Sequence, residues 1–323
     1  MKRILIIQTA FLGDVILATP VISELSKLFP SCKIDVLVRK GNESLLSNNS
    51  KISEVLILDK KAPKIQTLKN LIKIIRSKKY DEVINLHRFA STGILTAFSG
   101  AKSKVGFDKN PMSFAYSIKI KHSMTGKHEV ERNLECIAHH GASSFVKPGL
   151  VPSESDFQKV LPFSKEKYYC LAPASVWFTK QLPIPKWIEL ANQLSKEGKV
   201  YLLGGPGDRK LCDSILEKID SSNVENLAGN FSFLESAALM KNATRNYVND
   251  SGPMHICSAM NAPTTAFYCS TIPNFGFGPL ADDSEIKETT LDLSCRPCGL
   301  HGFKSCPKNH FDCGNSVILN VKF

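Results

Sequence analysis

An acidic residue follows the first apolar run of the chain closely. Residues 3–8 (RILIIQ) predict a buried strand, and Asp14 stands where we expect a helix over 14–28 to begin. An aspartate at this point could cap the helix by accepting hydrogen bonds from its unbonded N–H groups. It could also lie at the mouth of a cleft and take a proton from a hydroxyl group. The segment by itself favours the cap.

Small polar residues and a lysine follow another apolar run, YYCLA, in the second half of the chain. Ser175, Thr179 and Lys180 come after this predicted strand. Such residues at a strand end suit an anion, phosphate in particular. The alternative is a surface loop, but the neighbouring aromatic pair Trp177 and Phe178 argues against a purely solvated one.

The segment VNDSGPMH has the same character at a later strand end. It places Asp250, Ser251 and Gly252 after the strand, and Met254 and His255 open the next helix. Serine, glycine and the N–H groups of a helix start make a seat for phosphate. A single histidine in such a place is more often structural than functional.

Two further segments carry weaker signals. The turn LLGGPGD contains Gly205 but lacks the spacing of a dinucleotide fold or a P-loop, so a tight turn explains it, although its backbone could contact a nucleotide. The segment 127–133 (KHEVERN) predicts a capped helix start with solvated charges.

Four of the ten cysteines lie close together near the C-terminus, at Cys295, Cys298, Cys306 and Cys313. In a chain of the reducing cytosol such a cluster suggests a metal more than disulfides. The Cys-x2-Cys spacing suits zinc, and four thiolates would complete a structural site with no open position. Reduced thiols in a packed loop and an occasional disulfide are the alternatives.

Alternation of short apolar runs with amphipathic segments predicts an α/β protein with parallel sheets covered on both faces. A length of 323 residues suits two domains, which we place at 1–155 and 165–323, with a polar linker at 150–166. Ligands of such sheets bind beyond the carboxyl ends of the strands, so two units face to face would form a cleft. We expect strands at 3–8, 33–38, 54–58, 81–86, 103–107, 167–174, 199–204, 223–228, 245–249 and 263–269. We expect helices at 14–28, 64–78, 92–99, 184–197, 207–219, 232–242 and 252–260.

Composition and charge narrow the class of protein. The 43% of hydrophobic and 22% of charged residues are typical of a soluble globular chain. Asp14 interrupts the apolar start, which argues against a signal peptide, and we expect a cytoplasmic location. Residues 1–150 hold 24 Lys and Arg against 12 Asp and Glu, whereas the remainder holds 17 against 18. This asymmetry indicates an anionic partner or a lysine-rich solvated face.

The segments QTAFLGDVILATP, HRF, GFDKNP, HEVERN, SVWFTKQ, LLGGPGD, NLAG, NDSGPMH and the terminal CxxC resemble, in order and spacing, the ADP-heptose–lipopolysaccharide heptosyltransferases of glycosyltransferase family 9. The resemblance covers nearly the whole chain, and LGD and DSGPMH are its most specific parts. The sequence departs from the family's pattern at Ala174, where a glycine is frequent, and at Leu182, where a tryptophan is frequent.

The resemblance implies two Rossmann-like domains of the GT-B arrangement, an acceptor domain at 1–155 and a nucleotide-sugar domain at 165–323. It implies inverting transfer of heptose from ADP-heptose to Kdo or heptose of the lipopolysaccharide inner core, without a catalytic metal. Asp14 matches the family's general base, and Lys180 would stabilise the leaving phosphate. The predicted donor-binding residues are Ser175, Thr179, Lys180, Gly205, Asp250, Ser251, Gly252, Met254 and His255.

The same resemblance predicts a monomer that binds no nucleic acid and touches the anionic inner face of the cytoplasmic membrane. A related transferase that uses another nucleotide sugar or acceptor is the nearest alternative. The basic first half and the zinc-like tail also suggest a nucleic-acid-binding protein, but the lysines have few aromatic neighbours. An inactive sugar-binding relative is disfavoured by the presence of Asp14 and Lys180.

Overall fold

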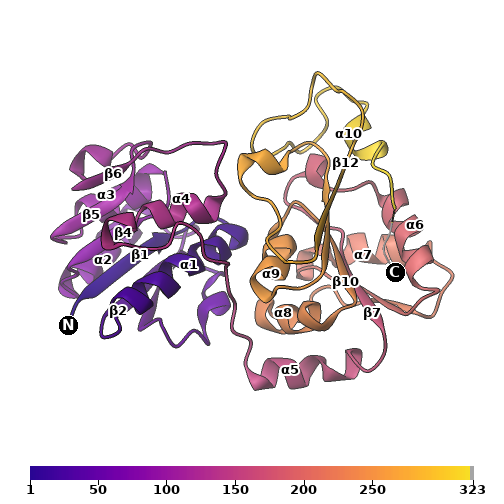
Figure 1. The fold of residues 1–323 in the computed structure, drawn as a ribbon, viewed down its shortest axis with the longest axis horizontal. Helices are drawn as coiled ribbons and strands as arrows, with labels where there is room; N and C mark the ends of the chain where they lie inside the picture. Colours follow the sequence, from indigo (N-terminus) through magenta and orange to yellow (C-terminus); the bar gives the residue numbers. More distant parts are fainter. Residues whose placement is uncertain (321–323) are drawn as a thin grey trace. The chain divides into compact units, whose positions relative to one another are not determined.

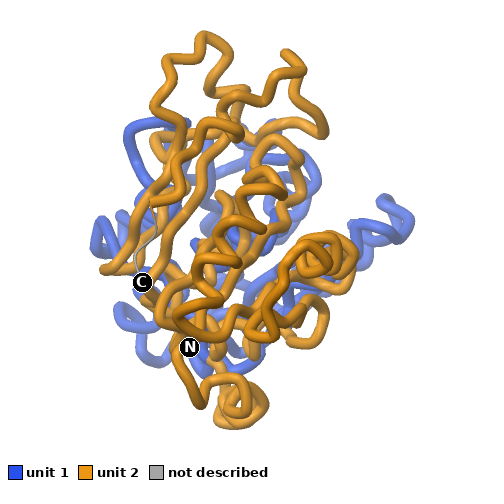
Figure 2. Tube along the Cα trace, turned by 90° about the vertical axis from the view of Figure 1, so that its right-hand side faces the viewer, with its two compact units in different colours: residues 1–151 blue, residues 152–323 orange. Residues whose placement is uncertain are grey.

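The computed structural model describes residues 1–320, so the last three residues of the predicted second domain, 321–323, lie outside the described residues. The chain forms two compact units, drawn in blue and orange in Figure 2. Unit 1 is Met1–Val151, and unit 2 begins at Pro152.

Unit 1 is built on a six-stranded parallel sheet with the strand order β3-β2-β1-β4-β5-β6. Its strands are β1 (Arg3–Gln8), β2 (Lys33–Arg39), β3 (Glu54–Leu58), β4 (Glu82–Asn85), β5 (Ser103–Phe107) and β6 (Ile118–Ile120). Its helices are α1 (Leu12–Leu28), α2 (Lys64–Ser77), α3 (Ala90–Ala97) and α4 (Glu129–Glu135). Helix α1 packs with α4, and α2 packs with α3.

Unit 2 repeats this architecture with the order β12-β11-β10-β7-β8-β9, also parallel throughout. Its strands are β7 (Tyr168–Ala172), β8 (Lys199–Leu202), β9 (Val224–Asn226), β10 (Arg245–Asn249), β11 (Thr264–Tyr268) and β12 (Ser284–Glu288). Its helices are α5 (Glu154–Val160), α6 (Ile184–Leu194), α7 (Arg209–Leu216), α8 (Phe233–Asn242), α9 (Gly252–Met260) and α10 (Asp312–Asn315). Helices α8 and α9 cover one face of the strands, and α6 and α7 cover the other (Figure 1).

The two sheets have the same topology. In each sheet the first strand of the unit lies in the middle, the next two strands are added on one side of it, and the last three lie on its other side. The crossing lies between β1 and β4 in unit 1 and between β7 and β10 in unit 2. In doubly wound sheets this reversal of strand order is where the loops separate and ligands bind. The topology therefore directs attention to the carboxyl ends of these four strands.

The central strands are buried on both faces, as their apolar sequences predict. Residues 4–8 of β1 are buried, and so is the whole of β7. Helix α1 is buried along one continuous stretch and contains Pro20, which cannot donate to the carbonyl of Ile16. The hydroxyl of Thr19 donates to that carbonyl instead, at 2.7 Å, so the helix continues with its polar groups satisfied.

The segment predicted as a linker differs from expectation. Helix α5 occupies Glu154–Val160 within it, and Ser153 caps the helix by accepting from the N–H of Asp156 at 3.2 Å. Helix α5 packs against α8, so this segment belongs to the body of unit 2. The short edge strands β6 and β12 were not predicted either, because their sequences carry too few apolar residues to stand out.

Candidate functional site

A buried hydrogen bond bridges the point in unit 1 where the strand order reverses. Thr9 follows β1 and His87 follows β4, and the Thr9 hydroxyl lies 3.0 Å from His87 Nδ1. The side chain of Asn85 accepts from the His87 N–H at 3.0 Å and donates to the Tyr116 hydroxyl at 2.9 Å. Burial, with the charges of Lys60 and Arg88, lowers the pKa of His87 to about 4. His87 is therefore a neutral, fixed hydrogen-bonding group at neutral pH.

Asp14 lies in the first turn of α1, half-buried, two residues after the helix begins at Leu12. Its carboxylate accepts from the N–H of Phe11 at 3.0 Å. The predicted N-cap role is thus corrected in detail, because Phe11 is the N-cap residue and Asp14 reaches back to it from within the helix. This bond uses Oδ2, and the arrangement holds a carboxylate at the carboxyl end of β1.

Glu129 and Arg132 of α4 correct the prediction that the charges of KHEVERN are solvated. Both side chains are buried, and Arg132 Nε donates to Glu129 Oε2 at 2.8 Å. Burial raises the pKa of Glu129 to about 7 against the pull of Arg132, and the negative charge of Asp14 adds to the rise. Two carboxyl groups, Asp14 and Glu129, are therefore electrostatically coupled in unit 1, and only one of them is buried deeply.

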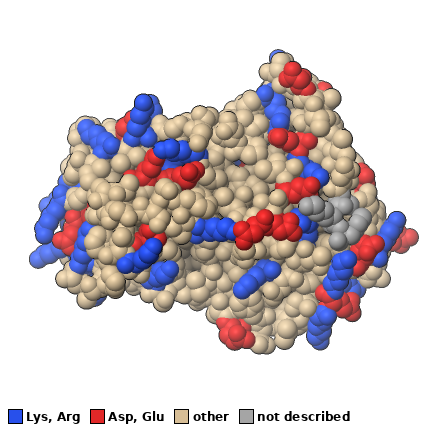
Figure 3. Space-filling model, viewed as in Figure 1, with Lys and Arg blue, Asp and Glu red and all other residues tan. Residues whose placement is uncertain are grey.

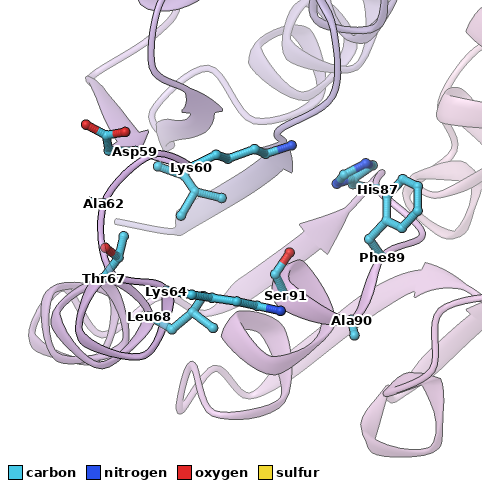
Figure 4. Close-up of a pocket in the computed structure, with 11 residues that line it drawn as sticks. Asp59, Lys60, Ala62, Lys64, Thr67, Leu68, His87, Phe89, Ala90 and Ser91 are labelled. Carbon is cyan, nitrogen blue, oxygen red and sulfur yellow. The ribbon is translucent and has the colours of Figure 1, made fainter.

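A cavity of about 510 Å³ opens beside His87. Figure 4 shows its lining, in which Lys60 extends in the direction of His87, and Lys64 extends in the direction of Ser91 at the start of α3. The acidic residue of the lining, Asp59, is 2.9 Å from Lys40 and so already paired. The cavity accordingly offers two ammonium groups and a serine hydroxyl, a set that suits an anionic ligand.

The charges on the surface do not form one basic patch on the face drawn in Figure 3, where Lys and Arg side chains are interspersed with Asp and Glu. A nucleic-acid-binding surface requires clustered Lys and Arg.

An ion pair bridges the corresponding point in unit 2. Lys180 follows β7 and Asp250 follows β10, and Lys180 Nζ lies 2.7 Å from Asp250 Oδ2. Thr271 donates to the same oxygen at 2.7 Å. Asp250 is buried and Lys180 is partly exposed, with 15% of its side chain accessible. The structure thus brings together two residues that sequence analysis selected from segments far apart in the chain.

Asn249 holds the loop that carries Lys180, and sequence analysis missed it. Its side chain is fully buried, accepts from the N–H of Leu182 at 2.9 Å and donates to the carbonyl of Pro173 at 2.8 Å. An asparagine that ends a buried strand was the available signal, because a buried amide must find partners.

Thr179 has a different place from the one predicted. Its hydroxyl accepts from the N–H of Phe303 at 2.7 Å and from the hydroxyl of Ser270 at 3.0 Å, and its side chain is buried. The backbone N–H of Thr179 also donates to the carbonyl of Phe303, at 3.1 Å. These bonds attach the cysteine-rich segment to the Lys180 loop, which gives Thr179 a structural role, and its contact with the donor stays a prediction.

The segment after β10 begins helix α9. Ser251 is its N-cap residue, Gly252 is its first residue, and Met254 and His255 are buried. Pro253 contributes no N–H, and the N–H of Met254 donates to the carbonyl of Ser251 at 3.1 Å. The helix start therefore offers fewer N–H groups to an anion than its sequence suggested. Ser251, Gly252 and Pro253 are its partly exposed members.

The remaining predicted donor residues lie in loops of unit 2. Gly205 is exposed, but its N–H donates to Asp208 at 2.8 Å. Ser175 is partly exposed, and its carbonyl accepts from the side chain of Gln181 at 2.7 Å. Ser175 and Lys180 belong to the same loop, and the hydroxyl of Ser175 is the group that this loop provides for a ligand in addition to the lysine.

The four clustered cysteines influence one another electrostatically. Burial, with the neighbouring thiols Cys298, Cys306 and Cys295, raises the pKa of Cys313 to about 11. Burial also acts on Cys306, but backbone N–H groups directed at its sulfur lower its pKa below the ordinary value. Cys295 Sγ lies 3.8 Å from His310 Nε2. Among residues 1–320, no three of these ligand atoms lie within 4.8 Å of one another, so this geometry is looser than that of a zinc site.

Comparisons with known proteins agree with this fold. The profile of the family described as Glycosyltransferase family 9 (heptosyltransferase) matches residues 68–301. The chain is 31% identical to lipopolysaccharide heptosyltransferase 3 of Escherichia coli over 277 residues, which are 81% of this chain and 82% of that protein. The structure of E. coli ADP-heptose lps heptosyltransferase II has a TM-score of 0.79 to this chain, with 22% identity and 98% of each chain covered. The structure of E. coli heptosyltransferase WaaC with ADP-2-deoxy-2-fluoro heptose has a TM-score of 0.72 to this chain, with 22% identity. The aligned part covers 89% of this chain and 93% of WaaC.

Two parallel sheets of this order, with polar groups at both reversal points, define a GT-B glycosyltransferase fold. The chain belongs to glycosyltransferase family 9, the heptosyltransferase family. Among residues 1–320, no helix combines the length and the apolar character needed to cross a membrane.

The contacts of Thr179 lead to a test of its role. We expect Thr179→Val to leave the N–H of Phe303 without its side-chain acceptor and to speed hydrogen exchange around residue 303 by up to about tenfold, since a lost hydrogen bond costs about 0.5–1.5 kcal/mol. The affinity for ADP should change little. Ser214→Ala is the control, because it removes a hydroxyl of α7 that donates to the carbonyl of Leu211, away from that attachment and from the proposed donor-binding residues. A loss of ADP affinity with unchanged exchange would return Thr179 to the donor-binding set.

The raised pKa of Glu129 predicts how the stability of the protein depends on pH. Its pKa lies near 7 in the folded protein against 4.5 in the unfolded chain, so the unfolded state releases its proton first as pH rises. The contribution of Glu129 to stability is therefore largest below pH 4.5 and falls as pH rises through about 7.

In thermal unfolding, Glu129→Gln should gain stability relative to the wild type as pH is raised from about 5 to about 7.5. His87 and His122, whose burial lowers their pKa values to about 4, contribute to both proteins and cancel in the difference. A difference that does not change with pH would contradict the burial of an uncharged Glu129.

Proposed function

We propose that the protein is an inverting transferase that moves heptose from ADP-heptose to the Kdo or heptose of the lipopolysaccharide inner core. The family match over residues 68–301 carries this proposal. The relative with ADP-2-deoxy-2-fluoro heptose supports the donor, and the named function of the E. coli relative supports a lipopolysaccharide acceptor. A transferase of the same fold with another nucleotide sugar or acceptor is the alternative.

In the proposed reaction, Asp14 acts as general base. The acceptor hydroxyl attacks the anomeric carbon, its proton passes to the Asp14 carboxylate, and the bond from that carbon to the ADP oxygen breaks. Support comes from the partly exposed carboxylate at the carboxyl end of β1 and from the bond to Phe11, which fixes its direction.

Lys180 would stabilise the negative charge that gathers on ADP as it leaves. Its ammonium is partly exposed and is held by Asp250, so it is oriented before a ligand arrives. Ser251 and Gly252 at the start of α9, with the hydroxyl of Ser175, would bind the diphosphate, and Asp250 would hold the turn. Thr179, Met254 and His255 are buried, and the N–H of Gly205 donates to Asp208. We assign these four residues to the support of this region.

The cavity of unit 1 suits the acceptor. Inner-core precursors carry phosphate and carboxylate groups, and Lys60 and Lys64 provide two ammonium groups beside the neutral His87. We therefore propose that unit 1 binds the acceptor and unit 2 the nucleotide sugar. The protein would work as a cytoplasmic monomer in peripheral contact with an anionic membrane surface, where lysines of unit 1 are attracted to the lipid.

We propose that Cys295, Cys298, Cys306 and Cys313 bind a structural zinc ion. The backbone N–H groups around Cys306 stabilise a thiolate, which is the form that ligates metal. The thiols already affect one another's ionisation, although the sulfurs must draw closer to share an ion. With four protein ligands the ion would stabilise the segment and take no part in transfer.

The base assignment predicts the behaviour of Asp14→Asn. We expect release of ADP from ADP-heptose with a Kdo-lipid A or heptosylated acceptor to fall by about a hundredfold or more, because an amide cannot take the proton. The fold should persist, since the amide oxygen can still accept from Phe11.

The same assay separates the outcomes for Asp14. Glu131→Gln, in the first turn of α4, is the control for a change of charge in unit 1 and should keep most of the activity. Activity that survives Asp14→Asn would reduce Asp14 to the support of its helix. Wild-type activity that appears only with UDP- or GDP-sugars would favour the alternative donor.

The zinc assignment predicts the metal content of the purified protein. Plasma mass spectrometry should find that Cys298→Ser and Cys306→Ser each lower the zinc content by one equivalent per chain, with ADP binding retained in both. Cys32→Ser, which changes a half-buried thiol of unit 1, is the control and should keep the zinc. An unchanged zinc content in the first two variants would exclude this site.

A further inference from the structure

Two adjacent histidines and a buried glutamate converge at the amino end of β4, within unit 1. Glu82 is the first residue of β4 and is 2% exposed. His139 Nε2 lies 3.0 Å from its Oε1, and His140 Nε2 lies 2.7 Å from its Oε2. The ligand atoms of these three residues all lie within 4.8 Å of one another, and no other His, Cys, Asp or Glu group among residues 1–320 meets that spacing.

The three side chains are held in position by their neighbours. The hydroxyl of Ser103 donates to Glu82 Oε1 at 3.3 Å. The ring of His140 meets Phe29 edge to face, with centroids 5.1 Å apart, and the two histidine rings are 3.9 Å apart. Such supporting contacts orient metal ligands before an ion binds.

Lys2 supplies the positive charge that the buried glutamate requires. Its Nζ lies 3.1 Å from Glu82 Oε2 and 3.5 Å from His140 Nε2. Nitrogen atoms of His139, His140 and Lys2 thus surround the carboxyl group of Glu82. Lys2 has 29% of its side chain exposed, so its ammonium can move into solvent when another cation replaces it.

We propose that Glu82, His139 and His140 bind one divalent transition metal ion in exchange with the ammonium of Lys2. Two imidazole nitrogens and a carboxylate oxygen suit zinc and its neighbours, whereas magnesium prefers oxygen alone. Water would complete the coordination, since three protein ligands leave a position open.

The proposed ion would be structural. Glu82 begins β4 and His87 follows its end, so the cluster and the Thr9–His87 pair lie at opposite ends of one strand. His139 and His140 belong to a short 3₁₀ turn, Ala138–His140, soon after α4. An ion here would fasten that turn to the sheet and so support the helix that carries Glu129.

The test uses the full chain, freed of metal by a chelator, with zinc chloride alone as the probe. Calorimetric titration should find one equivalent of zinc that His139→Ala loses, whatever the cysteine segment binds. In ¹⁵N-correlated spectra of the imidazoles, zinc should shift the signals that His139→Ala and His140→Ala identify, and magnesium should shift neither.

Lys2→Met gives the decisive second variant, because it removes the competing charge and leaves the ligands intact. We expect it to bind zinc at this site about tenfold more tightly than the wild type. Lys102→Met, which removes an exposed lysine paired with Asp81, is the matched control and should bind as the wild type does. An unchanged stoichiometry in His139→Ala, or an unchanged affinity in Lys2→Met, would overturn the proposal.

Discussion

The structure depends, in each unit, on a polar contact across the point where a parallel sheet reverses its strand order. The loops after two adjacent strands separate there toward opposite faces of the sheet. Polar groups at this point need a hydrogen-bond partner from the other loop. In unit 1 the contact is Thr9 to His87, and in unit 2 it is Lys180 to Asp250. A buried aspartate without its partner would be strongly destabilising, so the pair in unit 2 fixes both loops at once.

The apolar periodicity of the sequence was sufficient to predict the central strands and most helices, because strands buried on both faces must be apolar throughout. The segments that follow such strands also drew attention to Asp14, Lys180 and Asp250, whose roles in catalysis and binding stay predictions. The edge strands were not predicted. Strand β12, for example, alternates exposed and half-buried residues, so its sequence resembles that of a loop. The helix within the predicted linker carried a signal that was overlooked, namely Ser153 three residues before Asp156.

Contacts between distant segments could not be predicted from the sequence. Thr179 looks like a phosphate ligand in its own segment, and its partner Phe303 lies 124 residues later. Glu129 and Arg132 look like a solvated pair on a helix, because i and i+3 spacing does not reveal which face is buried. For Asn249 the sequence signals a buried amide that needs partners, but not that these partners are Leu182 and Pro173 of another loop.

The strand order also bears on how the protein is made. Strand β1 is synthesised first, yet one of its two neighbours in the sheet is β4, and Thr9 meets a residue 78 positions later. Closing so long a loop lowers the conformational entropy of the chain before the contact that offsets this loss has formed, and this slows the folding of parallel sheets. A nascent chain that has only β1, β2 and β3 outside the ribosome has an unpaired apolar edge on its central strand. The groups proposed for chemistry are thus assembled late, and a chain that is stalled early exposes a surface prone to aggregation.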